Sequence, residues 1–245
     1  RRSRAWLLAH PEHELSPAQI AKLEKLLNRR AGHEPLAYIR GKAEFYGREF
    51  VLTPAVLQPR PESETMIDLL KALPLFDASA DPATKKRAHL CLADIGTGSG
   101  ALGITALLEL PQITVDLIEI DPKALKIAKI NVDKFTLSIS PIRSDLLAQV
   151  TQNYDILLCN LPYVPDDFHI NRAASKEPAL AIFGGPDGLD LYRRLFQQIQ
   201  NLSKKPLYIL TESLPPQHQE LEKLARAAGF HLQQESDFIQ VFKPA

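Results

Sequence analysis

The sequence predicts an α/β fold: a doubly wound, mostly parallel seven-stranded sheet with one antiparallel strand, preceded by a small N-terminal helical domain and a β-hairpin. From His89 onward, short apolar runs alternate with stretches of helical length, which is the pattern of βαβ units. A short turn joins the last two runs, so these are expected to pair antiparallel. The N-terminal segment instead shows helical spacing followed by two short strands around a tight turn.

A helix is expected to begin after Ser16, with Ser16 as the N-cap, Pro17 in the first turn and Gln19 completing a capping box. Its apolar residues recur at helical spacing and a glycine ends it: Ile20, Leu23, Leu27 and Gly32. The hairpin strands are expected at 43–46 and 49–52. The Pro59-Arg60-Pro61 segment interrupts regular structure before a helix from Ser63 to about Leu73.

The polar stretch from Asp77 to Arg87 predicts a domain boundary. We therefore expect a helical docking domain at 1–42, a hairpin and connecting helix at 43–76, and a catalytic domain at 77–245. Strands of the last are expected at 90–94, 113–120, 138–142, 155–159, 206–210, 230–234 and 238–242. Helices between them are expected at 101–110, 122–134, 189–202 and 216–228.

The composition describes a folded protein, with 45% hydrophobic and 24% charged residues in a chain of 245. Cys91 and Cys159 lie far apart and form no metal-binding motif, which favours a reducing compartment and no metal site. Charge-free stretches are about half of the ~20 residues that a membrane-spanning helix needs. We expect a bacterial cytoplasmic protein, with the mitochondrial or plastid matrix as alternatives. The chain begins at Arg1 without a methionine, so the helical domain is expected to be shortened.

The net charge of zero conceals an asymmetry along the chain. Residues 1–60 contain eleven Lys and Arg against six Glu, a net charge of +5, so the remainder carries −5. This favours an N-terminal unit with its own partner, although solvated helix faces would give the same count.

A glycine loop, Asp94-Ile95-Gly96-Thr97-Gly98-Ser99-Gly100, separates an expected strand from an expected helix. Glycines there allow a tight turn and bring backbone N–H groups close to a nucleotide-like cofactor. The looser dinucleotide pattern also fits this loop, so the loop alone does not choose the cofactor.

An acidic residue ends the second strand, and another lies in the loop after the third. Glu119 is expected to accept both ribose hydroxyls of an adenosine, while Asp121 is expected to cap the following helix. Asp145, followed by Leu146, is a candidate acceptor for an adenine amino group. An ordinary helix cap is an equally good interpretation of Asp145.

The most informative segment follows the fourth strand, Asn160-Leu161-Pro162-Tyr163. The Asn160 side-chain carbonyl and the Pro162 main-chain carbonyl are placed to accept both hydrogens of a planar –NH₂ group, and Tyr163 is placed to pack beside it. We find no Ser/His/Asp order and no metal cluster, so positioning and electrostatics are favoured over covalent catalysis.

Together these segments resemble class I S-adenosylmethionine-dependent methyltransferases, with a Rossmann-like sheet, and more closely the HemK/PrmC family of release factor glutamine methyltransferases. The segments that carry the resemblance are 27–30, 34–41, the Phe45-Tyr46-Gly47 hairpin, Leu57-Gln58-Pro59-Arg60-Pro61-Glu62-Ser63-Glu64, the glycine loop and 160–163.

The resemblance implies a transfer of methyl from S-adenosyl-L-methionine, leaving S-adenosyl-L-homocysteine, to the glutamine of a release factor's Gly-Gly-Gln loop. It implies cofactor contacts at Gly96, Thr97, Gly98, Ser99, Gly100, Glu119, Asp145, Leu146 and Asn160. It implies substrate contacts at Asn160, Leu161, Pro162 and Tyr163, with Asn160, Pro162 and Tyr163 catalytic. It also implies that the N-terminal helices help to dock the release factor. The charge of the N-terminal unit alone suggests that this unit meets an acidic face of the release factor or weakly contacts nearby RNA.

Two residues depart from the family pattern. Leu161 replaces a proline, giving the Asn-Leu-Pro-Tyr form typical of ribosomal-RNA adenine dimethyltransferases, and Leu146 replaces an aromatic residue near the adenine. The alternatives are therefore methylation of an adenine amine in RNA or DNA, a non-catalytic cofactor-binding module and, least favoured, a nicotinamide oxidoreductase. The rival RNA enzymes lack the Pro59–Glu64 segment and carry their extra helical domain after the catalytic domain.

Overall fold

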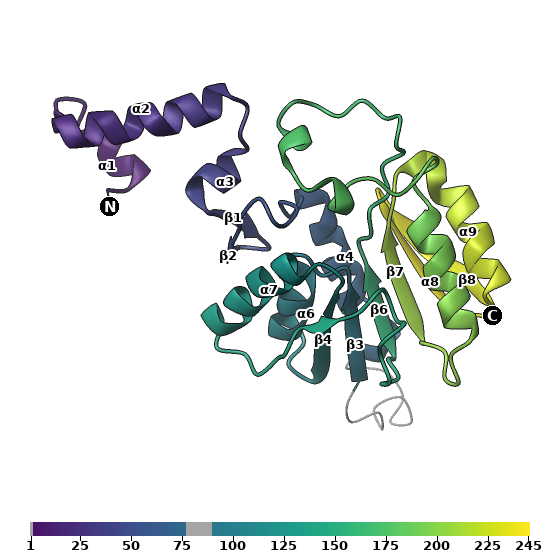
Figure 1. The fold of residues 1–245 in the computed structure, drawn as a ribbon. Coiled ribbons are helices and arrows are strands. Elements are labelled where there is room, and N and C mark those ends of the chain that lie inside the picture. The colour runs from purple at the N-terminus through teal and green to yellow at the C-terminus, as the bar shows by residue number, and fades with distance from the viewer. Residues whose placement is uncertain (1, 77–89) are drawn as a thin grey trace.

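The computed structural model describes residues 2–76 and 90–245. A seven-stranded sheet has the order β5-β4-β3-β6-β7-β9-β8 (Figure 1). Within this sheet, β9 alone runs opposite to the other six strands, which confirms the predicted topology. The strands are β3 Leu90–Ile95, β4 Ile113–Glu119, β5 Ile142–Arg143, β6 Ile156–Cys159, β7 Tyr208–Glu212, β8 Phe230–Ser236 and β9 Ile239–Pro244.

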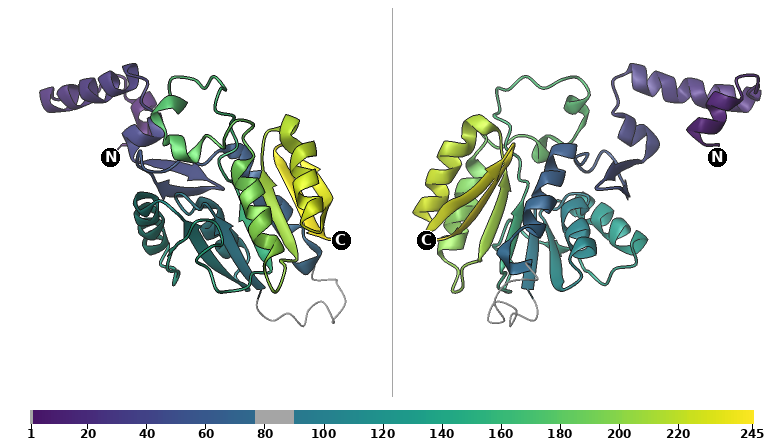
Figure 2. Two further views of the ribbon diagram at one scale, coloured as in Figure 1. Left: turned by 45° about the vertical axis from the view of Figure 1, so that its right-hand side comes forward. Right: turned by 180° about the vertical axis from the view of Figure 1, so that it is seen from behind.

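Helices cover both faces of this sheet (Figure 2). Alternate residues of β3 face opposite sides: Leu90 and Leu92 join one core, while Ala93 and Ile95 join the other. The first core is completed by α4 (Glu64–Lys71), α6 (Ala101–Glu109) and α7 (Pro122–Lys134), and the second by α8 (Asp190–Gln200) and α9 (His218–Ala227). Short 3₁₀ helices occupy Pro61–Ser63, Pro74–Phe76, Ala174–Lys176, Ala179–Ala181 and Pro215–Gln217.

Two strand boundaries differ from the sequence prediction. The strand expected at 138–142 pairs only through Ile142 and Arg143, because Pro141 cannot donate to a neighbouring strand. The strand expected at 206–210 begins two residues later, because the N–H groups of Leu207 and Tyr208 both donate to the carbonyl of Asp155. This shift places Glu212 at the end of β7.

The hairpin, β1 (Lys42–Phe45) and β2 (Arg48–Val51), packs into the first core of the sheet. Phe45 and Phe50 are fully buried there, beside Met66 and Ile67 of α4. Residues 43–76, predicted as a connecting unit, thus share a core with the sheet. The predicted boundary at 77–87 lies outside the described residues.

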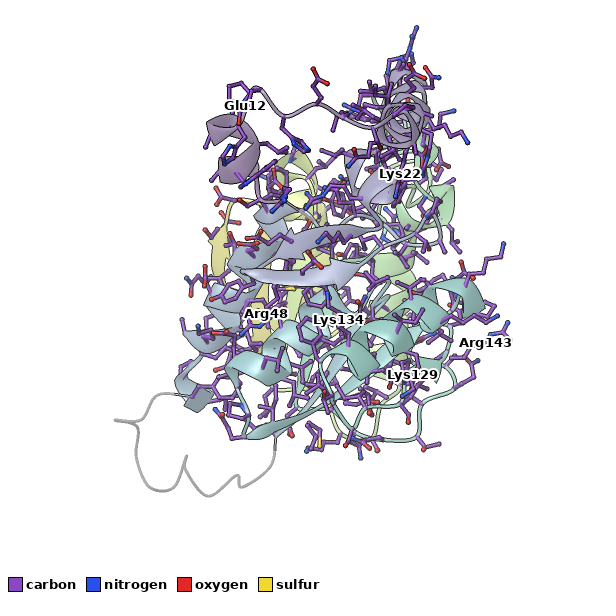
Figure 3. All side chains as sticks on the ribbon, turned by 90° about the vertical axis from the view of Figure 1, so that its left-hand side faces the viewer. Glu12, Lys22, Arg48, Lys129, Lys134 and Arg143 are labelled. Carbon is purple, nitrogen blue, oxygen red and sulfur yellow. The ribbon has the colours of Figure 1, made fainter. Side chains whose placement is uncertain are left out.

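Asn131 of α7 joins the hairpin to the glycine loop. Its side-chain carbonyl accepts the N–H of Val51 at 2.7 Å, and its amide donates to the carbonyls of Val51 at 3.0 Å and Ser99 at 2.8 Å. Lys134 reaches the hairpin from the same helix and donates to the carbonyl of Glu49 (Figure 3). The buried side-chain amide of Asn131 therefore holds the hairpin and the glycine loop in position relative to each other.

The N-terminal helices are α1 (Arg4–Ala9), α2 (Pro17–Ala31) and α3 (Leu36–Arg40). Ser16 and Gln19 form the predicted capping box, and α2 ends at Gly32 as predicted. Helix α2 projects away from the sheet (Figure 1) and buries none of its residues. Within the described residues, no helix combines the length and apolar character needed to cross a membrane.

Replacing Asn131 with Ala should lower the free energy of unfolding by about 2–4 kcal/mol, because backbone groups of half-buried Val51 and buried Ser99 lose their partners. Urea unfolding measures this loss. Asn201→Ala is the matched control, since that side chain is exposed and its amide, within residues 2–76 and 90–245, donates only to the carbonyl of Gln197. Its cost should stay within about 0.5 kcal/mol. Equal costs for the two variants would contradict the assignment.

Candidate active site

The glycine loop turns from β3 into α6 through three residues with left-handed backbone: Gly96 (φ 71°), Gly98 (φ 55°) and Gly100 (φ 83°). The N–H groups of Gly96 and Thr97 both donate to the carbonyl of Ile118 on β4. This attaches the loop to the neighbouring strand, so its position is fixed by the sheet.

The side chain of Asp94, the first residue of the glycine loop, holds the loop to the start of α6. One carboxylate oxygen, Oδ2, accepts the Thr97 hydroxyl at 2.5 Å and the N–H of Gly103 at 2.8 Å. Gly103 permits this contact, since a Cβ there would lie 2.9 Å from that of Asp94. Burial raises the pKa of Asp94 to about 6, although both hydrogen bonds oppose the shift.

Glu119, at the end of β4, contacts the glycine loop directly and lines the same pocket. It accepts the N–H of Gly98 at 3.0 Å on one oxygen and those of Ile120 and Asp121 at 2.9 and 3.0 Å on the other. Burial raises the pKa of Glu119. These contacts use three of roughly four acceptor positions of a carboxylate, which leaves one for a ribose hydroxyl rather than the two expected.

The segment after β5 forms a turn, so the helix-cap interpretation of Asp145 is wrong. Asp145 instead pairs with Arg194 of α8. Leu146 has left-handed backbone (φ 53°), held by the Ser144 hydroxyl, which donates to the Leu146 carbonyl at 2.8 Å. Such strain in a branched-chain residue is typical of functional sites. Asp121 caps α7 as predicted, through the N–H of Lys123.

Asn160 follows β6 and uses both hydrogens of its amide within the protein. They reach Ser63 Oγ at 3.0 Å and Glu212 Oε2 at 2.9 Å. The Asn160 Oδ1 and Pro162 carbonyl oxygens accept no hydrogen bond from the part of the chain that the structure describes. Among the described residues, two acceptors without a partner therefore lie two positions apart after the end of β6.

The neighbouring residues hold this segment closely. Leu161 is buried, and a Cβ added to Gly96 would come within 3.1 Å of its side chain. A Cβ on Gly184 would lie 2.3 Å from the Pro162 carbonyl oxygen, so only glycine allows this approach. The Tyr163 hydroxyl donates to Glu212 Oε1 at 3.0 Å.

These segments line one pocket of about 200 Å³ at the carboxyl ends of the strands. Its ionisable lining comprises four acids and one base, Asp94, Glu119, Asp121, Asp145 and Arg194. An excess of carboxyl groups suits a cationic ligand. A loop around Pro178 covers the pocket, and Glu177 holds that loop by pairing with Arg60 at 2.7 Å. Among the described residues, no group of three or more His, Cys, Asp or Glu could hold a metal ion.

Comparison with known proteins agrees with this geometry. Residues 1–41 match the PrmC N-terminal domain and residues 82–180 match the Methyltransferase small domain. The Release factor glutamine methyltransferase of Koribacter versatilis (strain Ellin345) is 34% identical over 85% of this chain and 73% of its own length. This chain belongs to the release factor glutamine methyltransferase family.

A second member of this family, from Moorella thermoacetica, is 36% identical over 93% of this chain and 78% of its own length. Among solved structures, the hMettl16 catalytic domain in complex with an RNA hairpin has a TM-score of 0.59. It covers 89% of this chain and 88% of its own at 13% identity, a level that shows the shared methyltransferase fold alone.

Release factor glutamine methyltransferases use S-adenosylmethionine as methyl donor, and so does this chain. The pocket fits that cofactor, because the acid-rich lining complements its sulfonium and the open Glu119 acceptor complements its ribose. Most residues that were predicted to contact the cofactor or the substrate line the pocket. They are Gly96, Thr97, Gly98, Ser99, Glu119, Asp145, Leu146, Asn160, Leu161 and Pro162. Gly100 and Tyr163 do not line it, since Gly100 precedes α6 and Tyr163 contacts Glu212.

Sequence reasoning missed Ser63, Glu212 and Arg194. Glu212 ends a buried strand, the same signal that singled out Glu119, but β7 was expected to stop at Leu210. Ser63 lies in the conspicuous Pro59–Glu64 segment, but no spacing rule relates it to Asn160. Only the fold brings them together.

Asp94 predicts a pH dependence of stability. Its pKa of about 6 exceeds its ordinary value of 3.8, so the folded state holds the proton more tightly than the unfolded chain. This contribution is full below pH 4 and is lost as pH rises to about 6, by about 2–3 kcal/mol. Asp94→Asn does not titrate, and its carbonyl can accept both hydrogen bonds.

The stability of Asp94→Asn relative to the wild type should therefore increase across this pH range. Urea unfolding at pH 4, 5, 6 and 7 measures the difference between the two proteins. A difference that stays constant from pH 4 to pH 7 would contradict the prediction.

Proposed function

We propose that this chain methylates the side-chain amide nitrogen of the glutamine in the Gly-Gly-Gln loop of a peptide chain release factor. The supporting observation is the pair of unused acceptors, Asn160 Oδ1 and the Pro162 carbonyl. The family name of the relatives points to the same substrate class.

The two acceptors explain how an amide becomes a nucleophile here. Amide nitrogens react poorly because the lone pair is delocalised into the carbonyl group. Accepting both N–H groups, at Asn160 and Pro162, holds the –NH₂ plane in one orientation for an in-line attack. The cofactor would supply an electrophilic methyl group on sulfur. As the nitrogen–methyl bond forms, the methyl–sulfur bond breaks and S-adenosyl-L-homocysteine leaves, while the nitrogen releases one of its two protons to water.

The adenine amine is the second candidate, because it presents the same planar –NH₂ group. The Asn-Leu-Pro-Tyr segment favours that alternative in the sequence. Leu161 lines the pocket, with its side chain buried beside Gly96 of the glycine loop. The family comparisons favour glutamine.

Incubation with labelled cofactor and either a release factor or structured RNA decides between the two substrates. We expect mass spectrometry to find one added methyl on the glutamine of the Gly-Gly-Gln loop. Asn160→Ala should lower the rate by about 10²–10³-fold, as for loss of a positioned polar group, while cofactor binding is partly retained.

Asn153→Ala is the matched control on the opposite end of β6, where the side chain is exposed. It should leave the rate within about twofold of the wild type, as surface changes usually do. Label on RNA alone, or full activity in Asn160→Ala, would overturn the proposed function.

The N-terminal helices are proposed to dock the release factor, in keeping with the family. Exposure of Ile20, Leu23 and Leu27 at 44%, 44% and 56% leaves their apolar side uncovered within the described residues. Arg29 and Arg30 are engaged by Glu34, so Lys22 and Lys25 are the better charged candidates. The same cations would contact neighbouring RNA.

Reversing charge at Lys22 and Lys25 to Glu should raise KM for the release factor by about three- to tenfold and leave kcat unchanged, since rim charges mainly steer association. The effect should shrink at high salt. Lys123→Glu with Lys126→Glu is the matched control, an identical charge change at the same spacing on α7. Equal KM shifts in the two pairs would contradict docking on α2.

A further inference from the structure

Glu212 is a buried acid for which the proposed reaction has no use so far. It ends β7 beside β6, it is only 1% exposed, and it does not line the pocket. Burial raises its pKa, while hydrogen bonds from Ser63, Tyr163 and Asn160 oppose the shift. Burying a carboxyl group costs free energy, so the hydrogen bonds that Glu212 accepts point to a function for this side chain.

The strand register places Glu212 beside Asn160. Cys159 of β6 pairs with Thr211 of β7, so the next residue on each strand is Asn160 and Glu212. The Tyr192 hydroxyl lies 2.9 Å from the carbonyl oxygen of Cys159 and 2.6 Å from that of Glu212. This contact joins the two strand ends from the α8 side.

The side-chain contacts select one of two orientations of the Asn160 amide. Glu212 Oε2 accepts from the Asn160 –NH₂ group at 2.9 Å and Oε1 accepts from the Tyr163 hydroxyl at 3.0 Å, so the –NH₂ group faces Glu212 and Oδ1 faces away. The reverse orientation would place Oδ1 against the carboxylate. It would also present an –NH₂ group to a substrate –NH₂ group, so two donors would meet.

We propose that Glu212 is a positioning residue that fixes the Asn160 amide in the orientation that accepts a substrate N–H, and that also holds Tyr163 through its second oxygen. The inference rests on the proposed function. Ser63 assists by accepting the other amide hydrogen of Asn160.

Two substitutions separate this role from a role of the charge itself. Glu212→Leu removes both acceptors and should lower kcat by about 100-fold, the usual cost of a misplaced group, with cofactor affinity nearly unchanged. Glu212→Gln should stay within about tenfold of the wild type, because its carbonyl can accept from Asn160 and its amide can donate to the Tyr163 hydroxyl. If Glu212→Gln loses as much as Glu212→Leu, the charge is required and the proposal fails.

A reciprocal exchange tests the contact even if Glu212→Leu does not fold. Asn160→Asp alone places two carboxylates about 3 Å apart and should lower kcat by about 100-fold. Combining it with Glu212→Gln restores a donor facing an acceptor and leaves a carboxylate oxygen toward the substrate. The double variant should recover at least about tenfold of the lost rate, whereas no recovery would overturn the proposal.

Asp155 provides the matched control, because it is a buried carboxylate at the other end of β6, paired with Lys204. Asp155→Asn and Asp155→Leu should lower stability and leave kcat close to that of the wild type. A fall in kcat equal to that of Glu212→Leu would show a general packing effect and would overturn the proposal.

A readout without substrate separates this inference from the proposed function. The Asn160 side-chain amide signals in an NMR spectrum, assigned by their loss in Asn160→Ala, should exchange slowly with water in the wild type and Glu212→Gln and quickly in Glu212→Leu. If that holds while no release factor is methylated, the proposed function fails and the positioning role stands. Unchanged exchange in Glu212→Leu would overturn the positioning role.

Discussion

The site depends on a constraint of chain geometry: strands that run parallel have their carboxyl ends at the same edge of the sheet. The glycine loop, Glu119 and Asn160 end β3, β4 and β6, which are neighbours in the strand order. These three groups are far apart in the sequence, at 94–100, 119 and 160. The sheet register makes them one pocket, and each later contact refines an arrangement that the topology has already imposed.

Buried polar side chains complete that arrangement. Asp94 holds the glycine loop from below, Asn131 attaches it to the hairpin, and Glu212 holds the amide segment. Each has hydrogen-bond partners that satisfy it, as burial of polar groups requires. Apolar packing alone would place these segments only approximately, whereas a hydrogen bond has a direction. The precision of the pocket therefore comes from few residues.

The sequence allowed the fold and most of the pocket lining to be predicted because their signals are local. The glycine pattern, the acid at the end of β4 and the two prolines after β6 each depend on adjacent residues. Contacts between distant segments gave no such signal: Ser63 meets Asn160 across 97 positions, and Arg60 meets Glu177 across 117. The predicted bounds of β7 were wrong for the same reason, because the strand begins where Leu207 and Tyr208 donate to the carbonyl of the distant residue Asp155.

Gly184 has a consequence for how the covering loop can evolve. Its backbone touches the Pro162 carbonyl, and a Cβ would also lie 2.5 Å from the Gly188 carbonyl oxygen. The N–H of Gly184 donates to the Val164 carbonyl at 2.9 Å and closes the loop at its base, so substitutions of exposed residues farther out in the loop would leave that contact in place. Related enzymes could therefore diverge in which protein they admit, while the place where the amide is held stays the same. The hydrogen atom that Gly184 carries in place of a side chain keeps the Pro162 carbonyl where it is, whatever residues the outer part of the loop presents to a partner.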